Sequence, residues 1–119
     1  MRYYDVYTPH CWAIVKIDSA SETIYKVLAG WYGGFAGSDE WRLNSGISSY
    51  EIEKENGEMF YIFKGYSGSV YRVHPTNEGF SGLSRSVFDN LQRSAETHSN
   101  SAVTHIAFED FVKEFKNDQ

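Results

Sequence analysis

Apolar and polar residues alternate with a period of two through most of residues 3–75, the spacing that places side chains on alternate faces of a β-strand. The segment 12–17 is apolar on both faces, a pattern typical of a central strand. Turn-forming residues at 18–21 join it to a second alternating segment, 23–31, which predicts an antiparallel hairpin. Further strands are predicted at 41–53, 59–64 and 70–73, and residues 1–9 are predicted to form an extended arm or an edge strand.

Glycine interrupts this alternation at positions that indicate turns. Asn56-Gly57 lies between two alternating segments and predicts a type I′ hairpin turn, because both residues tolerate positive φ. Gly46 lies inside the segment 41–53 and predicts a bulge or a bend in that strand. Residues 65–68 predict a second turn between strands.

The spacing of apolar residues changes at about Thr76. Between 84 and 97 they recur every three or four residues, which predicts an amphipathic helix with Ser84 as a candidate N-cap. A short strand at 103–108 and a short helix at 109–116 are predicted after it. Helices therefore follow strands in the predicted order of elements.

This order of elements predicts an α+β fold in a single domain, 1–119. The expected architecture is a mostly antiparallel sheet of five or six strands (residues 3–75), with one main helix (84–97) packed on it and a short strand and helix at the C-terminus. A chain of 119 residues is long enough to bury one core. Aromatic residues make up 17% of it, and they favour strands and contact surfaces.

The formal net charge of −5 argues against direct binding to nucleic acid, which needs a basic face. The glutamates between 51 and 58 are interpreted as a solvated strand face. Cys11 is the only cysteine, which is typical of a reducing compartment and of a small buried side chain. We found neither a signal peptide nor an apolar run long enough for a membrane span, so a soluble, cytoplasmic protein is expected.

The sequence contains fragments of catalytic motifs, but none is complete. The glycines between 30 and 37 match neither a dinucleotide-binding loop nor a Walker A loop, and they lead into a strand rather than a helix. The segments 65–69 and 79–83 lack the last glycine of a nucleophile elbow. His74-Pro75-Thr76 has no second copy, and the four histidines lack zinc-site spacing. The sequence therefore predicts no catalytic residue, metal or cofactor.

Residues 30–46 combine two of the three tryptophans with five of the ten glycines. Such a segment predicts a tight turn with aromatic walls. Two interpretations stay open: Trp31 and Trp41 fill the core, or they face solvent as a recognition patch. Arg42 binds an acidic group, stacks on a tryptophan or forms a solvated cross-strand ion pair. Under the recognition hypothesis, the candidate ligand- or partner-binding residues are Trp31, Tyr32, Phe35, Trp41, Arg42, Asn44 and Ser67.

Four phrases, at 11–16, 25–34, 41–47 and 67–71, resemble small uncharacterised accessory proteins of tailed bacteriophages. The resemblance covers roughly residues 3–75. It implies a phage protein that acts in the cytoplasm of the host bacterium, in host takeover or counter-defence. This family has no established catalytic residues, so the resemblance assigns none.

Three functional hypotheses follow. The first is a non-enzymatic phage accessory protein that binds and inhibits a host or bacterial defence protein, with a sheet edge that could support a homodimer. The second is a binding protein, or sponge, for a small nucleotide-like signal, with Arg42, Asn44 and Ser67 as polar anchors. The third is a small hydrolase whose site is assembled from distant parts of the chain.

Overall fold

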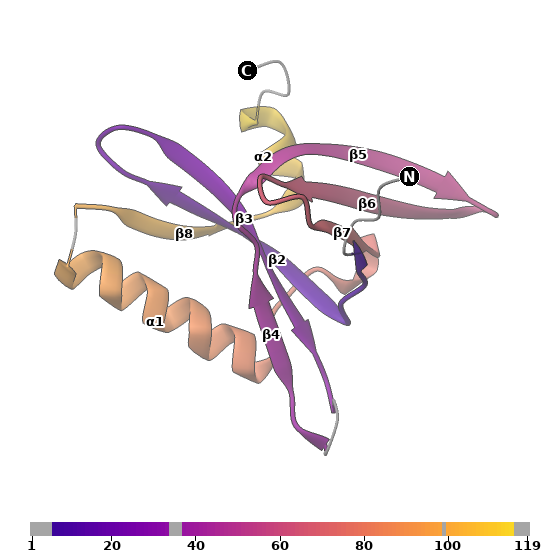
Figure 1. The fold of residues 1–119 in the computed structure, drawn as a ribbon, viewed down its shortest axis with the longest axis horizontal. Coiled ribbons are helices and arrows are strands. Elements are labelled where there is room, and N and C mark those ends of the chain that lie inside the picture. The colour runs from indigo at the N-terminus through magenta and orange to yellow at the C-terminus, as the bar shows by residue number, and fades with distance from the viewer. Residues whose placement is uncertain (1–5, 34–36, 99, 116–119) are drawn as a thin grey trace.

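The computed structural model describes residues 6–33, 37–98 and 100–115 (Figure 1). Its strands are β1 (Val6–Tyr7), β2 (Cys11–Asp18), β3 (Thr23–Trp31), β4 (Glu40–Leu43), β5 (Ile47–Glu55), β6 (Glu58–Gly65), β7 (Val70–Val73) and β8 (Ala102–Ile106). Its helices are a 3₁₀ turn (Pro75–Asn77), α1 (Gly82–His98) and α2 (Phe108–Glu114). The predicted α+β class, the main helix and the short C-terminal strand and helix are confirmed.

The strands of the described residues form two four-stranded sheets. Sheet A has the order β1-β7-β6-β5, and sheet B has the order β4-β3-β2-β8. Neighbouring strands are antiparallel except for β1 and β7, which are parallel. The predicted hairpins β2–β3 and β5–β6 are confirmed, but the prediction of a single sheet with five or six strands is wrong.

The division into two sheets takes place at Gly46, where the sequence predicted only a bend or a bulge. Strand β4 ends at Leu43 in sheet B, and β5 begins at Ile47 in sheet A. Gly46 has a φ of 135°, and a Cβ on it would lie 2.9 Å from the Tyr66 ring. A residue without a side chain therefore lets the chain turn sharply and cross from one sheet to the other.

The main core lies between the two sheets and is closed at one end by α2. Strands of sheet A cross those of sheet B in Figure 1, and apolar side chains from both meet there. Trp12 in β2 is fully buried, and its indole Nε1 donates to the carbonyl oxygen of His74 at 2.8 Å. The buried members of this cluster are Trp12, Ile14, Val27, Ala29, Ile47, Phe63, Tyr71, Val73, Ile106, Phe108 and Phe111.

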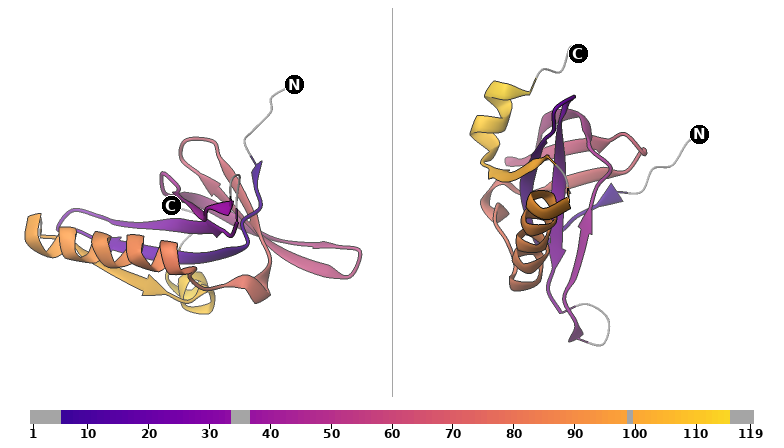
Figure 2. Two further views of the ribbon diagram at one scale, coloured as in Figure 1. Left: turned by 90° about the horizontal axis from the view of Figure 1, so that it is seen from below. Right: turned by 90° about the vertical axis from the view of Figure 1, so that its left-hand side faces the viewer.

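Helix α1 covers the opposite face of sheet B, where it contacts β8, β3 and β4 (Figure 2). Phe88 and Ala95 of the helix pack there against Val15, Leu28 and Val103. Strand β2 lies between β3 and β8 and is covered on both faces. This explains why segment 12–17 is apolar on both faces.

Helix α1 begins at Gly82, two residues before the predicted start at 84. Its N-cap is Ser81 rather than the predicted Ser84. The Ser81 Oγ accepts a hydrogen bond from the Ser84 backbone N–H at 3.0 Å. The Ser84 Oγ in turn accepts one from the Ser81 N–H at 2.8 Å. This reciprocal arrangement is a capping box with serine at both positions.

Candidate functional site

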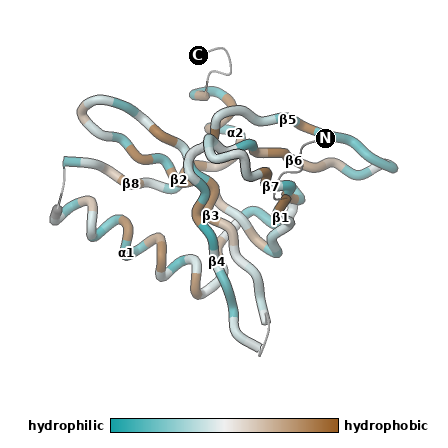
Figure 3. Tube along the Cα trace, viewed as in Figure 1, coloured by the Kyte–Doolittle hydropathy of each residue, from teal (hydrophilic) through white to brown (hydrophobic). Residues whose placement is uncertain are grey.

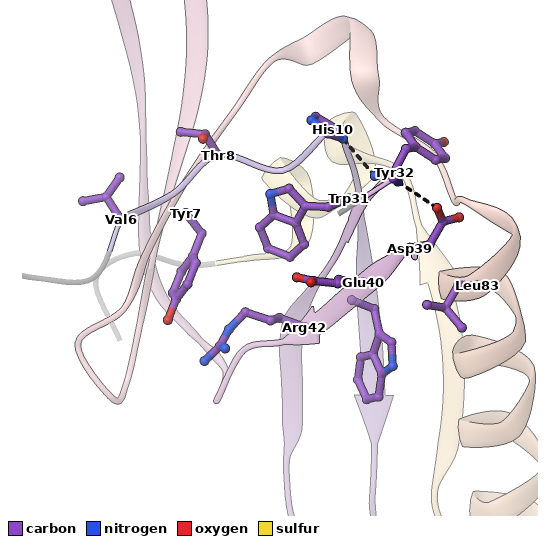
Figure 4. Close-up of a pocket in the computed structure, with 12 residues that line it drawn as sticks. Val6, Tyr7, Thr8, His10, Trp31, Tyr32, Asp39, Glu40, Arg42 and Leu83 are labelled. Carbon is purple, nitrogen blue, oxygen red and sulfur yellow. Dashed lines mark hydrogen bonds between the residues drawn. The ribbon is translucent and has the colours of Figure 1, made fainter. Parts of the chain in front are cut away.

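An open pocket of about 870 Å³ lies between β1, the β3–β4 hairpin and the start of α1 (Figure 4). Its walls therefore come from parts of the chain that are far apart in sequence. The lining residues are Val6, Tyr7, Thr8, His10, Trp31, Tyr32, Gly33, Asp39, Glu40, Trp41, Arg42 and Leu83.

One wall of the pocket is formed where Tyr7 joins the two sheets. Its ring stacks on Tyr71 of sheet A at 5.0 Å and meets Trp31 of sheet B edge-on at 6.3 Å. The Arg42 guanidinium carbon lies 4.5 Å from the centre of the Tyr7 ring, which is cation–π geometry. Burial raises the pKa of Tyr71, and a hydrogen bond with Arg42 acts in the opposite direction. The interactions hold Arg42 against this wall.

A second wall is fixed by hydrogen bonds at the end of β3. The Tyr32 N–H donates to Nδ1 of His10 at 2.9 Å, and the two rings stack with an interplanar angle of 6°. The Gly33 N–H donates to a carboxylate oxygen of Asp39 at 3.0 Å. Gly33 has a φ of 57°, a conformation that glycine adopts without strain. These contacts help to position the Tyr32 ring, which is 50% exposed.

Tyr32 stays neutral over the physiological pH range. A side-chain hydrogen bond with Cys11 raises the pKa of the Tyr32 phenol above its usual value of 10.0. Cys11 itself is only 6% exposed and follows His10 of the pocket wall in sequence. We therefore interpret the thiol as a buried group that helps to hold the exposed Tyr32 ring in the wall.

Trp41 lies on the other side of β4 from the Tyr7 wall. It pairs with Gly30, whereas Trp31 pairs with Glu40 and Ala29 pairs with Arg42. Because faces alternate along a strand, Trp31, Glu40 and Arg42 share one face and Trp41 projects from the opposite face. Trp41 is 43% exposed. Trp31 therefore packs against the core cluster and Trp41 faces solvent, and a recognition role for Trp41 stays a prediction.

The charges at the pocket come mainly from β4 and the residue before it. Asp39 and Glu40 contribute carboxylates and Arg42 contributes a guanidinium. Figure 4 shows the Glu40 side chain between the Trp31 indole and Arg42. The Nδ1 of His10 is already occupied by the hydrogen bond from the Tyr32 N–H. The pocket therefore carries aromatic walls and a small excess of negative charge.

Two of the predicted site residues lie outside the pocket. Asn44 is 5% exposed, and its Oδ1 accepts from the backbone N–H groups of Val27 and Gly46 at 2.9 and 3.2 Å. Ser67 lies in the β6–β7 turn, where its N–H donates to Ser45 Oγ at 3.0 Å. Asn44 thus supports the crossing between sheets. Phe35, which was also predicted as a site residue, lies outside the described residues.

Trp31, Tyr32, Trp41 and Arg42 are the predicted residues that the structure brings together at the pocket. The sequence prediction missed Tyr7, His10 and Asp39. The aromatic residues of the first segment were a signal for Tyr7. However, no local pattern indicated that β1 pairs with β7 beside the β3–β4 hairpin.

Comparisons of the chain with protein-family models, curated proteins and solved structures give no significant match. In the described part of the chain, no group of three or more His, Cys, Asp or Glu side chains could hold a metal ion. No described helix combines the length and apolar character needed to cross a bilayer. The function is therefore inferred from the geometry of the pocket.

The His-x-Thr segment has a local structural role. His74 follows β7, and its Nδ1 accepts the Thr76 N–H at 3.3 Å and lies 2.7 Å from Thr76 Oγ1. The ring therefore caps the 3₁₀ turn that begins at Pro75. It is separate from the pocket.

Proposed function

We propose that this chain is a binding protein that recognises a partner protein through the pocket, without catalysing a reaction. The observation that carries the proposal is the exposure of two large aromatic side chains at the pocket, Tyr32 and Trp41 at 50% and 43%. Trp12 is the tryptophan that fills the core, whereas the Tyr32 and Trp41 rings are exposed and available for contact. Exposed aromatic side chains on a rigid framework are the typical anchors of protein interfaces.

The charge of the pocket favours a protein over a nucleotide-like ligand. A nucleotide phosphate needs several cations or backbone N–H groups around it. Here Arg42 is engaged with Tyr7 and Tyr71, and it shares the pocket with the carboxylates of Asp39 and Glu40. Aromatic walls with mixed charges suit the side chains of a protein surface.

The bacteriophage resemblance extends this proposal to a biological setting. A small phage accessory protein that binds without catalysis would act by occupying a surface of a host or defence protein. We propose this inhibitory role on the resemblance alone, and the pocket supports only the binding step.

The test is capture of partners from a bacterial host lysate with the tagged chain and two matched variants. Tyr32→Ala removes an exposed ring at the pocket, and Tyr66→Ala removes one that is 71% exposed in the β6–β7 turn near Ser67. A partner bound at the pocket should be captured at least tenfold less by Tyr32→Ala, the loss typical of an interface anchor of roughly 1.4 kcal/mol or more. Capture by Tyr66→Ala should stay at the wild-type level.

Two outcomes would contradict the proposal. One is equal capture by wild type and Tyr32→Ala when circular dichroism shows that both are folded. The other is a small-molecule adduct, seen by native mass spectrometry after incubation with lysate, that Tyr32→Ala loses; this would favour the nucleotide-binding hypothesis.

A further inference from the structure

Strand β4 is the outer strand of sheet B, and among the described residues no strand pairs with it on the side away from β3. The Asn44 N–H donates to the Val27 carbonyl oxygen, so by alternation Arg42 and Glu40 also direct their backbone groups toward β3. The backbone groups of Trp41 and Leu43 therefore point outward. No described residue forms a hydrogen bond with them. Such an edge can pair with another strand.

The outer strands β5 and β8 are protected in ways that β4 is not. The outer part of the β5–β6 hairpin is hydrophilic (Figure 3), and β5 carries Glu51, Glu53 and Glu55. Pairing of β5 with a second copy would crowd these carboxylates and disturb their ion pairs with Lys64 and Arg72, which is unfavourable. At β8, the Val103 carbonyl oxygen already accepts a hydrogen bond from Gln92 Nε2 of α1 at 2.9 Å. Among these edges, β4 is the one suited to pairing.

The sequence Glu40-Trp41-Arg42 is complementary to itself in an antiparallel arrangement. When Trp41 lies opposite Trp41 of a second copy, each Glu40 lies opposite an Arg42. Trp41 directs its N–H and carbonyl outward, as a residue at the centre of a hydrogen-bonded antiparallel pair must. Cross-strand pairs of opposite charge and of aromatic rings both stabilise antiparallel pairing.

Arg42 can take part while it keeps its contacts within the chain. It lies over Tyr7 and hydrogen-bonds with Tyr71. A guanidinium has five N–H donors in a planar fork and can serve more than one acceptor. Glu40 and Arg42 share one face of β4, so both reach the same side of the joined sheet.

We propose that two copies of this chain associate through antiparallel β4–β4 pairing centred on Trp41, with two reciprocal Glu40–Arg42 ion pairs. The interface has two-fold symmetry, and the two B sheets become one continuous sheet. It also brings the two pockets to neighbouring positions. The edge is only four residues long and each copy has a net charge of −5, so we expect a dissociation constant of roughly micromolar order.

The first test is sedimentation equilibrium of the full chain over a range of concentrations up to about a hundred times this dissociation constant. The wild type should form a dimer, and Glu40→Lys should raise its dissociation constant at least tenfold, because two attractive pairs become repulsive. The charge-swapped variant Glu40→Lys with Arg42→Glu should restore dimerisation, because each Lys then faces a Glu. A wild type that stays monomeric at every concentration, or a dimer unaffected by Glu40→Lys, would overturn the proposal.

A second test isolates the backbone contribution. Trp41→Ala and Trp41→Pro both remove the indole, but only proline also removes the outward N–H. Proline is tolerated on an edge strand where the N–H faces solvent, so both variants should fold. We expect Trp41→Pro to dimerise at least tenfold more weakly than Trp41→Ala. Equal dimerisation by two folded variants would show that β4 does not pair.

This inference shares Trp41 with the proposed function, but the two are tested by separate measurements. Dimerisation is measured on the pure protein, whereas partner binding is measured by capture with Tyr32→Ala. If the wild type is monomeric and Tyr32→Ala no longer captures the host partner, the dimer proposal is overturned and the binding function stands.

Discussion

At the scale of single residues, Gly30 shows how closely the base of the pocket is packed. A Cβ on residue 30 would lie 2.9 Å from the Cys11 sulfur and 3.1 Å from the Ser81 Oγ. Cys11 and Ser81 are both buried, so neither can move aside easily. Glycine therefore allows β3 to pass close to β2 and to the N-cap of α1.

We expect Gly30→Ala to lower the free energy of unfolding by about 1–3 kcal/mol, because the added methyl group overpacks this position. In a Cys11→Ala background, the cost should fall by at least about 0.5 kcal/mol, since the nearest atom is gone. Urea denaturation of the single and double variants measures both quantities.

The matched control is Gly82→Ala at the start of α1. A Cβ on residue 82 would meet no atom within 4 Å. Its stability should therefore lie within about 0.5 kcal/mol of the wild type. If Gly30→Ala were as stable as Gly82→Ala, close packing at residue 30 would be the wrong explanation.

At the scale of elements, α2 is attached to sheet B by a polar cluster at its C-terminal end. Glu114 of α2 accepts hydrogen bonds from the Lys16 ammonium at 2.6 Å and from the Tyr25 hydroxyl at 2.9 Å. The hydrogen bond with Lys16 is the main cause that lowers the pKa of Glu114. The hydrogen bond with Glu114 raises the pKa of Lys16, while burial is the main cause that raises the pKa of Tyr25.

These shifts predict how the stability difference between wild type and Glu114→Gln depends on pH. The folded-state pKa of Glu114 lies below its usual 4.5, so its contribution is present above 4.5 and is lost as the pH falls further. The raised pKa values of Lys16 and Tyr25 mean that their contribution is present below about 10 and is lost in more alkaline solution. Chemical denaturation across the pH range measures the difference.

A Lys16→Gln background provides the control for this prediction. Without the ammonium group, Glu114→Gln should change the free energy of unfolding less between pH 4.5 and about pH 10, because the main cause of the lowered Glu114 pKa is gone. A stability difference that grows as the solution becomes acidic would contradict the assignment.

At the scale of the whole molecule, sheet B is the middle layer and belongs to both cores. Its β2 and β3 strands contribute Trp12 and Ile14 to the core against sheet A, and Val15 and Leu28 to the core beneath α1. Because successive residues of the same strands support the two cores, we expect all three layers to unfold together.

Phe88→Ala tests this expectation, because Phe88 belongs to the core beneath α1 and is 4% exposed. We expect a loss of about 3–5 kcal/mol. The helical circular dichroism signal and the NMR signal of the Trp12 indole N–H should shift to the same lower urea midpoint. If only the helical signal shifted, α1 and the sandwich of sheets would be separate folding units, and the single-domain prediction would be wrong.

Much of the local structure could be predicted because it depends on neighbours in sequence. Alternation identified β2, β3 and β6, and helical spacing identified α1. Asn56 and Gly57 have φ values of 52° and 83°, as the predicted type I′ turn requires. The acidic face of β5 is exposed, as predicted for a solvated strand face. Its Glu53 and Glu55 side chains both form ion pairs with Arg72.

The sequence by itself determined most of the elements, the α+β class and the aromatic segment that borders the pocket, because side-chain spacing and turn stereochemistry act over a few residues. Only the tertiary structure decided that the strands form two sheets and that Tyr7 and His10 join Trp31 and Tyr32 in one pocket. The physical reason is that strand pairing is chosen by the burial of side chains from distant segments. At Gly46, the same local signal is compatible with a bent strand and with a crossing between sheets.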